Sequence, residues 1–169
     1  DGTLEEVLLL PFKGANREQE SELVTMLNKL LAELGLLEKK KSQINQLSGG
    51  QQRRAFLARA LLVILWNAKP GLPTVLVLDE ATVGLDLTTQ VELLHLLLHY
   101  SKTENPELSL VVISHDPIVL RYICDQFLVI YGEESEDSGA TIVETLDKEQ
   151  FINGPYKHKH TQRLLKAIY

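Results

Sequence analysis

The feature that most constrains the fold is an uninterrupted run of β-branched residues and leucine at positions 74–78, which ends in two carboxylates. Such a run, without polar alternation, is typical of a strand buried on both faces of a parallel sheet. Helical and strand patterns then alternate along the chain. The expected elements are a helix at 88–101, a strand at 108–114, a helix at 117–124 and a strand at 127–131. This alternation predicts an α/β fold with parallel pairing.

Two helices are expected ahead of the first strand. Over residues 18–34 leucine and methionine recur at spacings of three, four, seven and eight, and Gly35 stands where the helix should end. A second helix is expected at 50–66, followed by a loop at 67–73 that contains two prolines and a glycine. The sequence up to residue 66 therefore reads as a helical segment, and residues 67–144 read as an α/β core.

After the last expected parallel strand, the alternation of strands and helices gives way to an expected hairpin and a helical tail. An acidic loop at 133–137 separates that strand from a short strand at 141–144, which predicts a hairpin. From residue 147 to the end we expect a helix, a turn at Gly154 and Pro155, and a second helix. Residues 145–169 therefore form a third segment, a C-terminal helical tail.

Composition narrows the class of protein. A chain of 169 residues suits a single globular domain. With 17 basic and 23 acidic residues, its net charge of −6 disfavours a nucleic-acid partner. The single cysteine, Cys124, cannot form an internal disulfide. We find no apolar run of about 18 residues and no signal peptide, so we expect a reducing, cytoplasmic setting.

The stretch LSGGQQRR at 47–54 has two interpretations. Ser48 and Gln51 satisfy a capping box, which by itself explains a helix that starts here. Gly49 and Gly50 would also let a ligand approach the main chain, and a helix N-terminus attracts anions such as phosphate. The two arginines that follow favour an anion, because cations in a first helical turn oppose the helix dipole.

Asp79 and Glu80 emerge at the carboxyl end of the buried strand, where ligands bind in open α/β sheets. Asp79 could hold Mg²⁺ through its water shell while Glu80 orients or deprotonates an attacking water, as phosphoryl transfer requires. The alternative is a strand that happens to stop at acidic residues.

His115 follows the strand at 108–114, so parallel pairing would bring it to the same edge of the sheet. Its ring could donate a hydrogen bond to a terminal phosphate, or it could be an exposed loop histidine. Asp116 with Pro117 predicts a capped helix in either case. In ATVGLD at 81–86, Gly84 allows a tight turn and Asp86 can cap the next helix.

Taken in order, LSGGQ, VLVLDE, ATVGLD and ISHD resemble the signature motif, Walker B motif, D-loop and switch histidine of ATP-binding-cassette (ABC) ATPases. The resemblance covers about residues 23–144 and implies a P-loop NTPase-like α/β fold with ATP and Mg²⁺ as ligands. It also implies that Asp79 is the carboxylate on the magnesium side, that Glu80 is catalytic, and that His115 senses the γ-phosphate.

By the same resemblance the SGGQ residues bind nucleotide, with Ser48 and Gly50 touching the γ-phosphate of ATP held mainly by the opposite subunit. Asp86 is then a dimer-interface residue. The implied partners are a second nucleotide-binding domain in a head-to-tail dimer and transmembrane permease subunits. The implied location is peripheral, on the cytoplasmic face of the membrane.

The tail is similar to the branch that imports peptides and nickel, which implies an importer of peptides or metal chelates. That branch usually has His-Pro-Tyr-Thr before its final leucines. His158 and Thr161 fit this pattern, whereas Lys159 and His160 replace the proline and tyrosine. Metal binding by His158 and His160 is an alternative to a solvated helix start.

The phosphate-binding loop of these ATPases, G-x-x-x-x-G-K-[ST], is missing, because the chain has no Gly-Lys pair. The sequence resembles the C-terminal two thirds of a nucleotide-binding domain: a helical signature subdomain and a parallel-sheet Walker B half. An apolar edge of the strand at 74–78 would then be exposed. We therefore expect a chain that is poorly soluble alone, dimeric, or completed by another polypeptide.

Two other functions remain open. A non-transport ABC ATPase of the chromosome-maintenance or repair type would explain a signature motif without a P-loop, but it predicts a long coiled coil where residues 18–34 form one short helix. A degenerate, non-catalytic subunit is the other alternative, and retention of both Asp79 and Glu80 speaks against it.

Overall fold

The computed structural model describes residues 2–132 and 139–166. The acidic loop expected at 133–137 and the last three residues of the expected tail lie outside the described residues. The chain divides into two compact units, Asp1–Leu76 with Ala81–Val111 and Val77–Glu80 with Val112–Tyr169.

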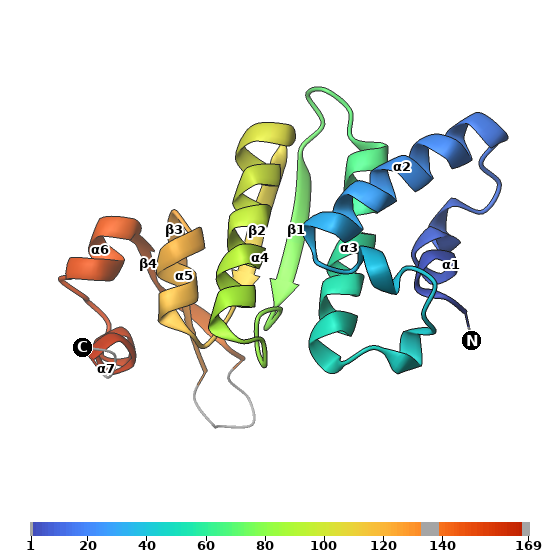
Figure 1. Ribbon diagram of the computed structural model, residues 1–169. Coiled ribbons are helices and arrows are strands. Elements are labelled where there is room, and N and C mark those ends of the chain that lie inside the picture. Colours follow the sequence, from blue (N-terminus) through green and yellow to red (C-terminus); the bar gives the residue numbers. More distant parts are fainter. Residues whose placement is uncertain (1, 133–138, 167–169) are drawn as a thin grey trace. The chain divides into compact units, whose positions relative to one another are not determined.

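The first unit begins with three α-helices, α1 (Leu4–Leu9), α2 (Arg17–Glu33) and α3 (Gly49–Asn67), visible in Figure 1. Helices α2 and α3 confirm the two helices expected from the leucine spacing, within one residue at each end. Gly35 has φ +64° just after α2, a conformation that glycine adopts without steric cost. The leucines that face inward are almost fully buried: Leu23, Leu27, Leu30 and Leu31 on α2 and Leu57, Leu61 and Leu62 on α3.

Helix α4 (Leu87–His99) does not continue regularly to residue 101 as expected. It ends in a π-helical turn, Tyr100–Glu104. The Tyr100 side chain is buried, and its hydroxyl donates a hydrogen bond to Glu33 Oε2 on α2 at 2.7 Å. Burial and the neighbouring carboxylate raise the pKa of Tyr100, so the hydroxyl remains a donor.

Strands β1 (Thr74–Asp79) and β2 (Leu108–Ile113) pair in parallel. The Thr74 N–H donates to the Glu107 carbonyl at one end, and the Glu80 N–H donates to the Ile113 carbonyl at the other, both at 2.9 Å. These bonds join start to start and end to end, which confirms the parallel pairing expected for these strands.

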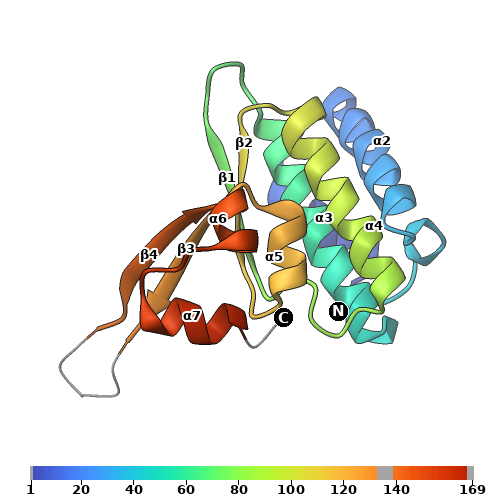
Figure 2. The same cartoon turned by 90° about the vertical axis from the view of Figure 1, so that its left-hand side faces the viewer.

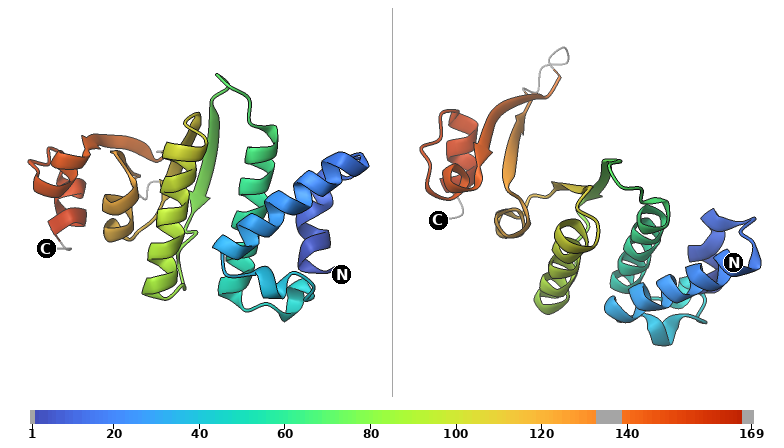
Figure 3. Two further views of the ribbon diagram at one scale, coloured as in Figure 1. Left: turned by 45° about the horizontal axis from the view of Figure 1, so that its top comes forward. Right: turned by 90° about the horizontal axis from the view of Figure 1, so that it is seen from above.

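The expectation that the first strand is buried on both faces is wrong. Leu76 and Leu78 are buried, but Val75 and Val77 are 57% and 58% exposed. Figure 3 shows α3 and α4 on one side of the strand pair. Val111 and Ile113 of β2 are exposed as well. The described chain therefore covers one face of this sheet and leaves an apolar, β-branched face open.

The second unit contains α5 (Pro117–Ile123), β3 (Gln126–Tyr131), β4 (Thr141–Asp147), α6 (Lys148–Asn153) and α7 (Lys159–Lys166). Strand β3 does not extend the parallel sheet as the alternation predicted. It pairs antiparallel with β4, as Figure 2 shows, which confirms the expected hairpin. The apolar residues of these elements form a small core: Phe127, Val129, Leu146, Phe151 and Leu165.

The tail confirms the expected order of helix, turn and helix. Glu144 on β4 holds the start of α7, because its two carboxylate oxygens accept the N–H groups of Lys157 at 2.7 Å and His158 at 3.1 Å. His158 Nδ1 in turn accepts the N–H of His160 at 3.2 Å. These contacts match a helix start, and among the described residues no three His, Cys, Asp or Glu side chains form a metal-binding group.

Candidate functional site

The second unit brings Glu80 and His115 into direct contact. Glu80 follows β1 and His115 follows β2, so the parallel pairing of the two strands delivers both residues to one edge. Glu80 Oε1 lies 2.8 Å from His115 Nδ1 and also accepts the His115 backbone N–H at 3.1 Å. The two residues that the sequence placed at a common edge are therefore hydrogen-bonded to each other.

Glu80 has an unusual backbone and one unused oxygen. It is the only described non-glycine residue with a positive φ, at +48°, a left-handed conformation that is costly for a side chain with Cβ. Its Oε2 atom is buried and has no hydrogen-bond partner among the described residues. A strained backbone and an unsatisfied polar atom at one residue are typical of functional sites.

The exposed His115 ring pairs with this carboxylate, and the hydrogen bond and charge of Glu80 raise the pKa of His115 above its usual value of 6.5. The raised pKa means that pairing stabilises the fold below about pH 6.5 and that this contribution is lost as the pH rises through the folded-state pKa.

We expect an NMR titration of the His115 ring to show a midpoint above 6.5, which Glu80→Gln shifts back toward 6.5. An unchanged midpoint in that variant would contradict the pairing.

Asp79 is the last residue of β1, and its side chain is exposed. Its carboxylate makes no hydrogen bond or ion pair within the part of the chain that the structure describes. The free Asp79 carboxylate is a hard oxygen ligand of the kind that Mg²⁺ prefers. Asp79 is therefore suited to hold a magnesium ion, while the unused Oε2 of Glu80 is left for another role.

The first unit contains the SGGQ stretch at the N-terminus of α3. Ser48 Oγ accepts the Gln51 N–H at 3.3 Å, and Gln51 Oε1 accepts the Ser48 N–H at 2.9 Å, which confirms the capping box. Apart from the neighbouring residues and the backbone of the helix itself, no atom of the described residues lies within 4 Å of where a Gly49 Cβ would stand, so the main chain there is open to a ligand. A Cβ on Gly50 would come within 3.2 Å of Leu85 Cδ2, so this glycine also packs against the ATVGLD loop.

Asp86 caps α4, as the sequence predicted. Its Oδ1 accepts the Thr89 N–H at 3.0 Å and its Oδ2 accepts the Thr89 hydroxyl at 2.7 Å, and these bonds lower the pKa of Asp86. Gly84 has φ +74°, and a Cβ there would stand 2.7 Å from an Arg53 guanidinium nitrogen. Sequence reasoning missed this contact of Arg53 with the loop. The only signal for it was the glycine in a tight turn.

Thus Ser48, Gly50 and Asp86 belong to the first unit, whereas Asp79, Glu80 and His115 belong to the second. Within the first unit Leu85 joins the SGGQ helix to the ATVGLD loop. Within the second unit strand pairing joins the carboxylate to the histidine. A helix N-terminus can accept an anion and a carboxylate can orient an attacking water, and both kinds of group are used in phosphoryl transfer.

Comparison with known proteins points the same way. Residues 3–83 match the family described as ABC transporter. The methionine import ATP-binding protein MetN of Vibrio cholerae is 36% identical over 137 residues, which are 81% of this chain and 37% of MetN. The oligopeptide transport ATP-binding protein AmiF of Streptococcus pneumoniae is 31% identical over 152 residues, 89% of this chain and 44% of AmiF.

The fold is also similar to that of a solved protein of an ABC transporter complex. The structure of cbiO1 from Clostridium perfringens, part of the ABC transporter complex cbiONQ, superposes with a TM-score of 0.64 at 21% identity and covers 89% of this chain and 53% of cbiO1. The sequence places this chain in the ABC transporter family. The two curated relatives are named as ATP-binding proteins for methionine import and oligopeptide transport, and the likeness to cbiO1 shows the fold alone. The chain spans about 37% to 44% of the length of these two relatives.

Among the described residues, no helix combines the length and apolar character needed to cross a bilayer.

Proposed function

We propose that this chain takes part in binding and hydrolysing ATP, to ADP and phosphate, in an ABC importer. The single observation that carries the proposal is the contact between Glu80 and His115, 2.8 Å apart at the end of two parallel strands. Here the carboxylate stands on a left-handed residue and keeps one oxygen unused, which favours a catalytic role.

In this proposal Glu80 acts as the general base. Its Oε1 is occupied by His115, so Oε2 is the atom that would take a proton from the attacking water. In its protonated form His115 would donate from Nδ1 to the carboxylate and from its exposed Nε2–H to a terminal phosphate oxygen. Glu80 therefore needs His115 both for orientation and for compensating charge.

Asp79 would hold Mg²⁺, which when bound neutralises charge on the phosphates. At the SGGQ tip, the N–H groups of the first turn of α3 would bind the γ-phosphate beside Gly49, where the main chain is open. Asp86 fixes the start of α4, and the ATVGLD loop that it anchors would face a second nucleotide-binding domain.

The partners we propose are a second nucleotide-binding domain in a head-to-tail arrangement and transmembrane permease subunits, with the chain peripheral on the cytoplasmic face of the membrane. The open β-branched face of β1 and β2 supports completion by further polypeptide, since four exposed valine and isoleucine side chains are unfavourable in water. The relatives named for methionine and oligopeptide transport favour a solute of that chemistry.

The proposal makes a direct prediction for the isolated chain. Because the sequence lacks the Gly-Lys pair that holds the β- and γ-phosphates, calorimetry should detect no ATP binding up to about 1 mM, with or without Mg²⁺. Adding a polypeptide that carries a phosphate-binding loop should restore both binding and hydrolysis. Micromolar affinity of the isolated chain would contradict the assignment of roles.

A further inference from the structure

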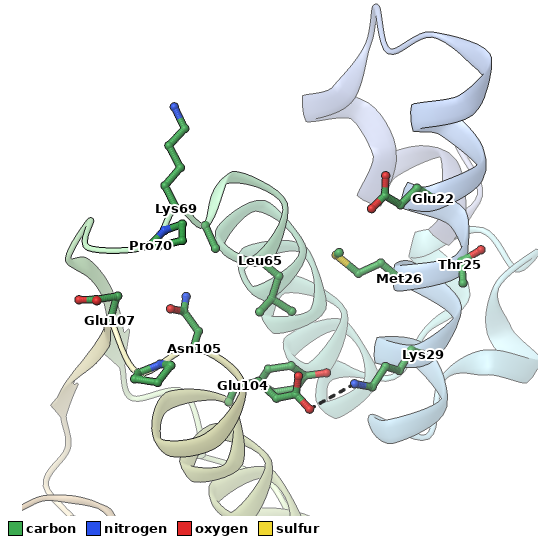
Figure 4. A pocket seen from close by; sticks show the side chains of 13 residues that line it. Glu22, Thr25, Met26, Lys29, Leu65, Lys69, Pro70, Glu104, Asn105 and Glu107 are labelled. Atoms are coloured by element: carbon green, nitrogen blue, oxygen red, sulfur yellow. Dashed lines mark ion pairs between the residues drawn. The ribbon is translucent and has the colours of Figure 1, made fainter.

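A pocket of about 830 Å³ lies in the first unit, between α2 and the C-terminal end of α3, as Figure 4 shows. Its rim carries charges of both signs, because Lys29 and Glu104 pair there at 3.7 Å and Lys69 shares its side of the pocket with Glu107. Such a rim favours no single charge on a ligand. The turn that carries His115, in the second unit, has a more specific arrangement.

Only three residues, Ser114, His115 and Asp116, separate the last residue of β2 from the first residue of α5. Ser114 is half-buried, and its Oγ accepts the Asp116 N–H at 3.0 Å. A serine hydroxyl that accepts the N–H two residues further on closes a tight turn over the residue between them. The residue enclosed in this way is His115.

The far end of the turn is anchored to α5. Asp116 Oδ1 accepts the Ile118 N–H at 2.9 Å and the Val119 N–H at 3.5 Å, so the side chain of Asp116 fixes this end. Between the two ends, the N–H and Nδ1 of His115 both meet Glu80 Oε1, at 3.1 and 2.8 Å. Two contacts from one residue to one oxygen require the main chain and the ring to be aimed together, and the turn sets the direction of the main chain.

The near end of the turn holds the backbone of Glu80. The Glu80 N–H donates to the carbonyl of Ile113, which directly precedes Ser114, at 2.9 Å. Glu80 is therefore held by its main chain just before Ser114 and by its side chain just after Ser114. These bonds keep a backbone with φ +48° in place and leave Oε2 without a described partner. A change in the shape of the turn would move one hold relative to the other and redirect Oε2.

We propose that Ser114 is a positioning residue for Glu80: its hydroxyl holds the turn in the shape in which the His115 N–H and ring both meet Oε1. This inference rests on the proposed function, in which Oε2 takes a proton from water. Ser114 touches neither the water nor the phosphate and acts only through His115. A misplacement of about 1 Å can lower a rate about 10²-fold, so one hydroxyl that sets this geometry matters for turnover.

The first test is an NMR titration of the His115 ring in the full chain. The carboxylates of Glu80 and Asp116 act on this ring, and both raise its pKa above 6.5. Ser114→Ala should lower the midpoint toward 6.5, because a relaxed turn loosens the contact with Glu80. Ser114→Thr and Ser114→Val have the same shape and differ in one hydroxyl, so the first should keep the wild-type midpoint and the second should lower it.

A double variant shows whether Ser114 acts through Glu80. In the Glu80→Gln background, Ser114→Ala should shift the midpoint no further, because the charge that raises the pKa through this contact is already gone. The matched control is Ser101→Ala, which removes another half-buried hydroxyl, one that donates to the Leu98 carbonyl at 3.3 Å, and should leave the midpoint unchanged. A wild-type midpoint in Ser114→Ala and Ser114→Val, or a shift that persists in the Glu80→Gln background, would overturn the proposal.

The second test measures phosphate release after assembly with a polypeptide that carries a phosphate-binding loop. Ser114→Ala and Ser114→Val should lower the rate by about tenfold with ATP affinity unchanged, whereas Ser114→Thr and Ser101→Ala should match the wild type. A wild-type rate in Ser114→Ala together with a loss in Glu80→Gln would overturn the positioning role and leave the proposed function standing. A wild-type rate in Glu80→Gln would refute the proposed function, and the titration would still decide whether Ser114 holds His115.

Discussion

Replacing Glu80 with glutamine is expected to lower the rate of ATP hydrolysis by about 10²- to 10⁴-fold once the chain is assembled with a phosphate-binding loop. Glutamine keeps the size of the side chain and can still accept from the His115 N–H, but its amide cannot take a proton from water. Nucleotide binding should persist, since the base acts in the chemical step. The measurement is phosphate release together with ATP affinity in the same preparation.

The control for this variant is Glu38→Gln, which removes the same charge at an exposed position outside the site. Its hydrolysis rate should equal that of the wild type. If Glu80→Gln hydrolysed ATP at the wild-type rate, Glu80 could not be the general base and its pairing with His115 would be structural. If both hydrolysis and ATP affinity were lost together, the carboxylate would be needed for binding instead.

Leu27→Ala is expected to have the largest effect on stability. Leu27 is 0% exposed on α2, a helix that packs against α3, and removing its buried methyl groups leaves a cavity that costs about 2–5 kcal/mol. A domain is stable by only about 5–15 kcal/mol, so this one change removes a large share of that stability. Trp66, the single tryptophan, lies on α3 and reports on this unit, so its fluorescence during urea unfolding gives the measurement.

Leu37→Ala is the matched control, because the same atoms are removed from a side chain that is 41% exposed. Its unfolding free energy should stay within about 0.5 kcal/mol of the wild type. Equal losses in the two variants would mean that α2 and α3 do not form the core of this unit.

Local signals in the sequence predicted most of the elements. The capping box of Ser48 and Gln51 located the start of α3, and the capping aspartates Asp86 and Asp116 located the starts of α4 and α5. Asp116 indeed accepts the Ile118 N–H at 2.9 Å. Leucine spacing located α2. These signals work because caps and amphipathic faces depend on residues only a few positions apart.

What the sequence could not predict depends on distant partners. The apolar run of β1 indicated two covered faces, but whether a second layer exists depends on polypeptide outside the run, and here Val75 and Val77 are exposed. The alternation of elements likewise suggested that β3 would continue the sheet, whereas it pairs with β4. The first helix, α1, was missed because its six residues are too few to show a period, although the capping box of Thr3 and Glu6 marks its start.

For the candidate site, the ordered motifs predicted candidate residues whose roles remain predictions, and strand topology predicted that Glu80 and His115 would lie at one edge of the sheet, where they are hydrogen-bonded. The sequence could not show that Glu80 has a positive φ, that its Oε2 has no described partner, or that Arg53 contacts Gly84. Each of these depends on backbone geometry or on a contact between residues far apart along the chain.

The backbone at Glu80 has a consequence for anyone who redesigns this protein. At φ +48° glycine or asparagine would relax the main chain, so a procedure that ranks substitutions by folding energy alone would select against glutamate at position 80. Engineering for heat tolerance should therefore hold this position fixed, because the residue that serves folding least is the one on which turnover would depend.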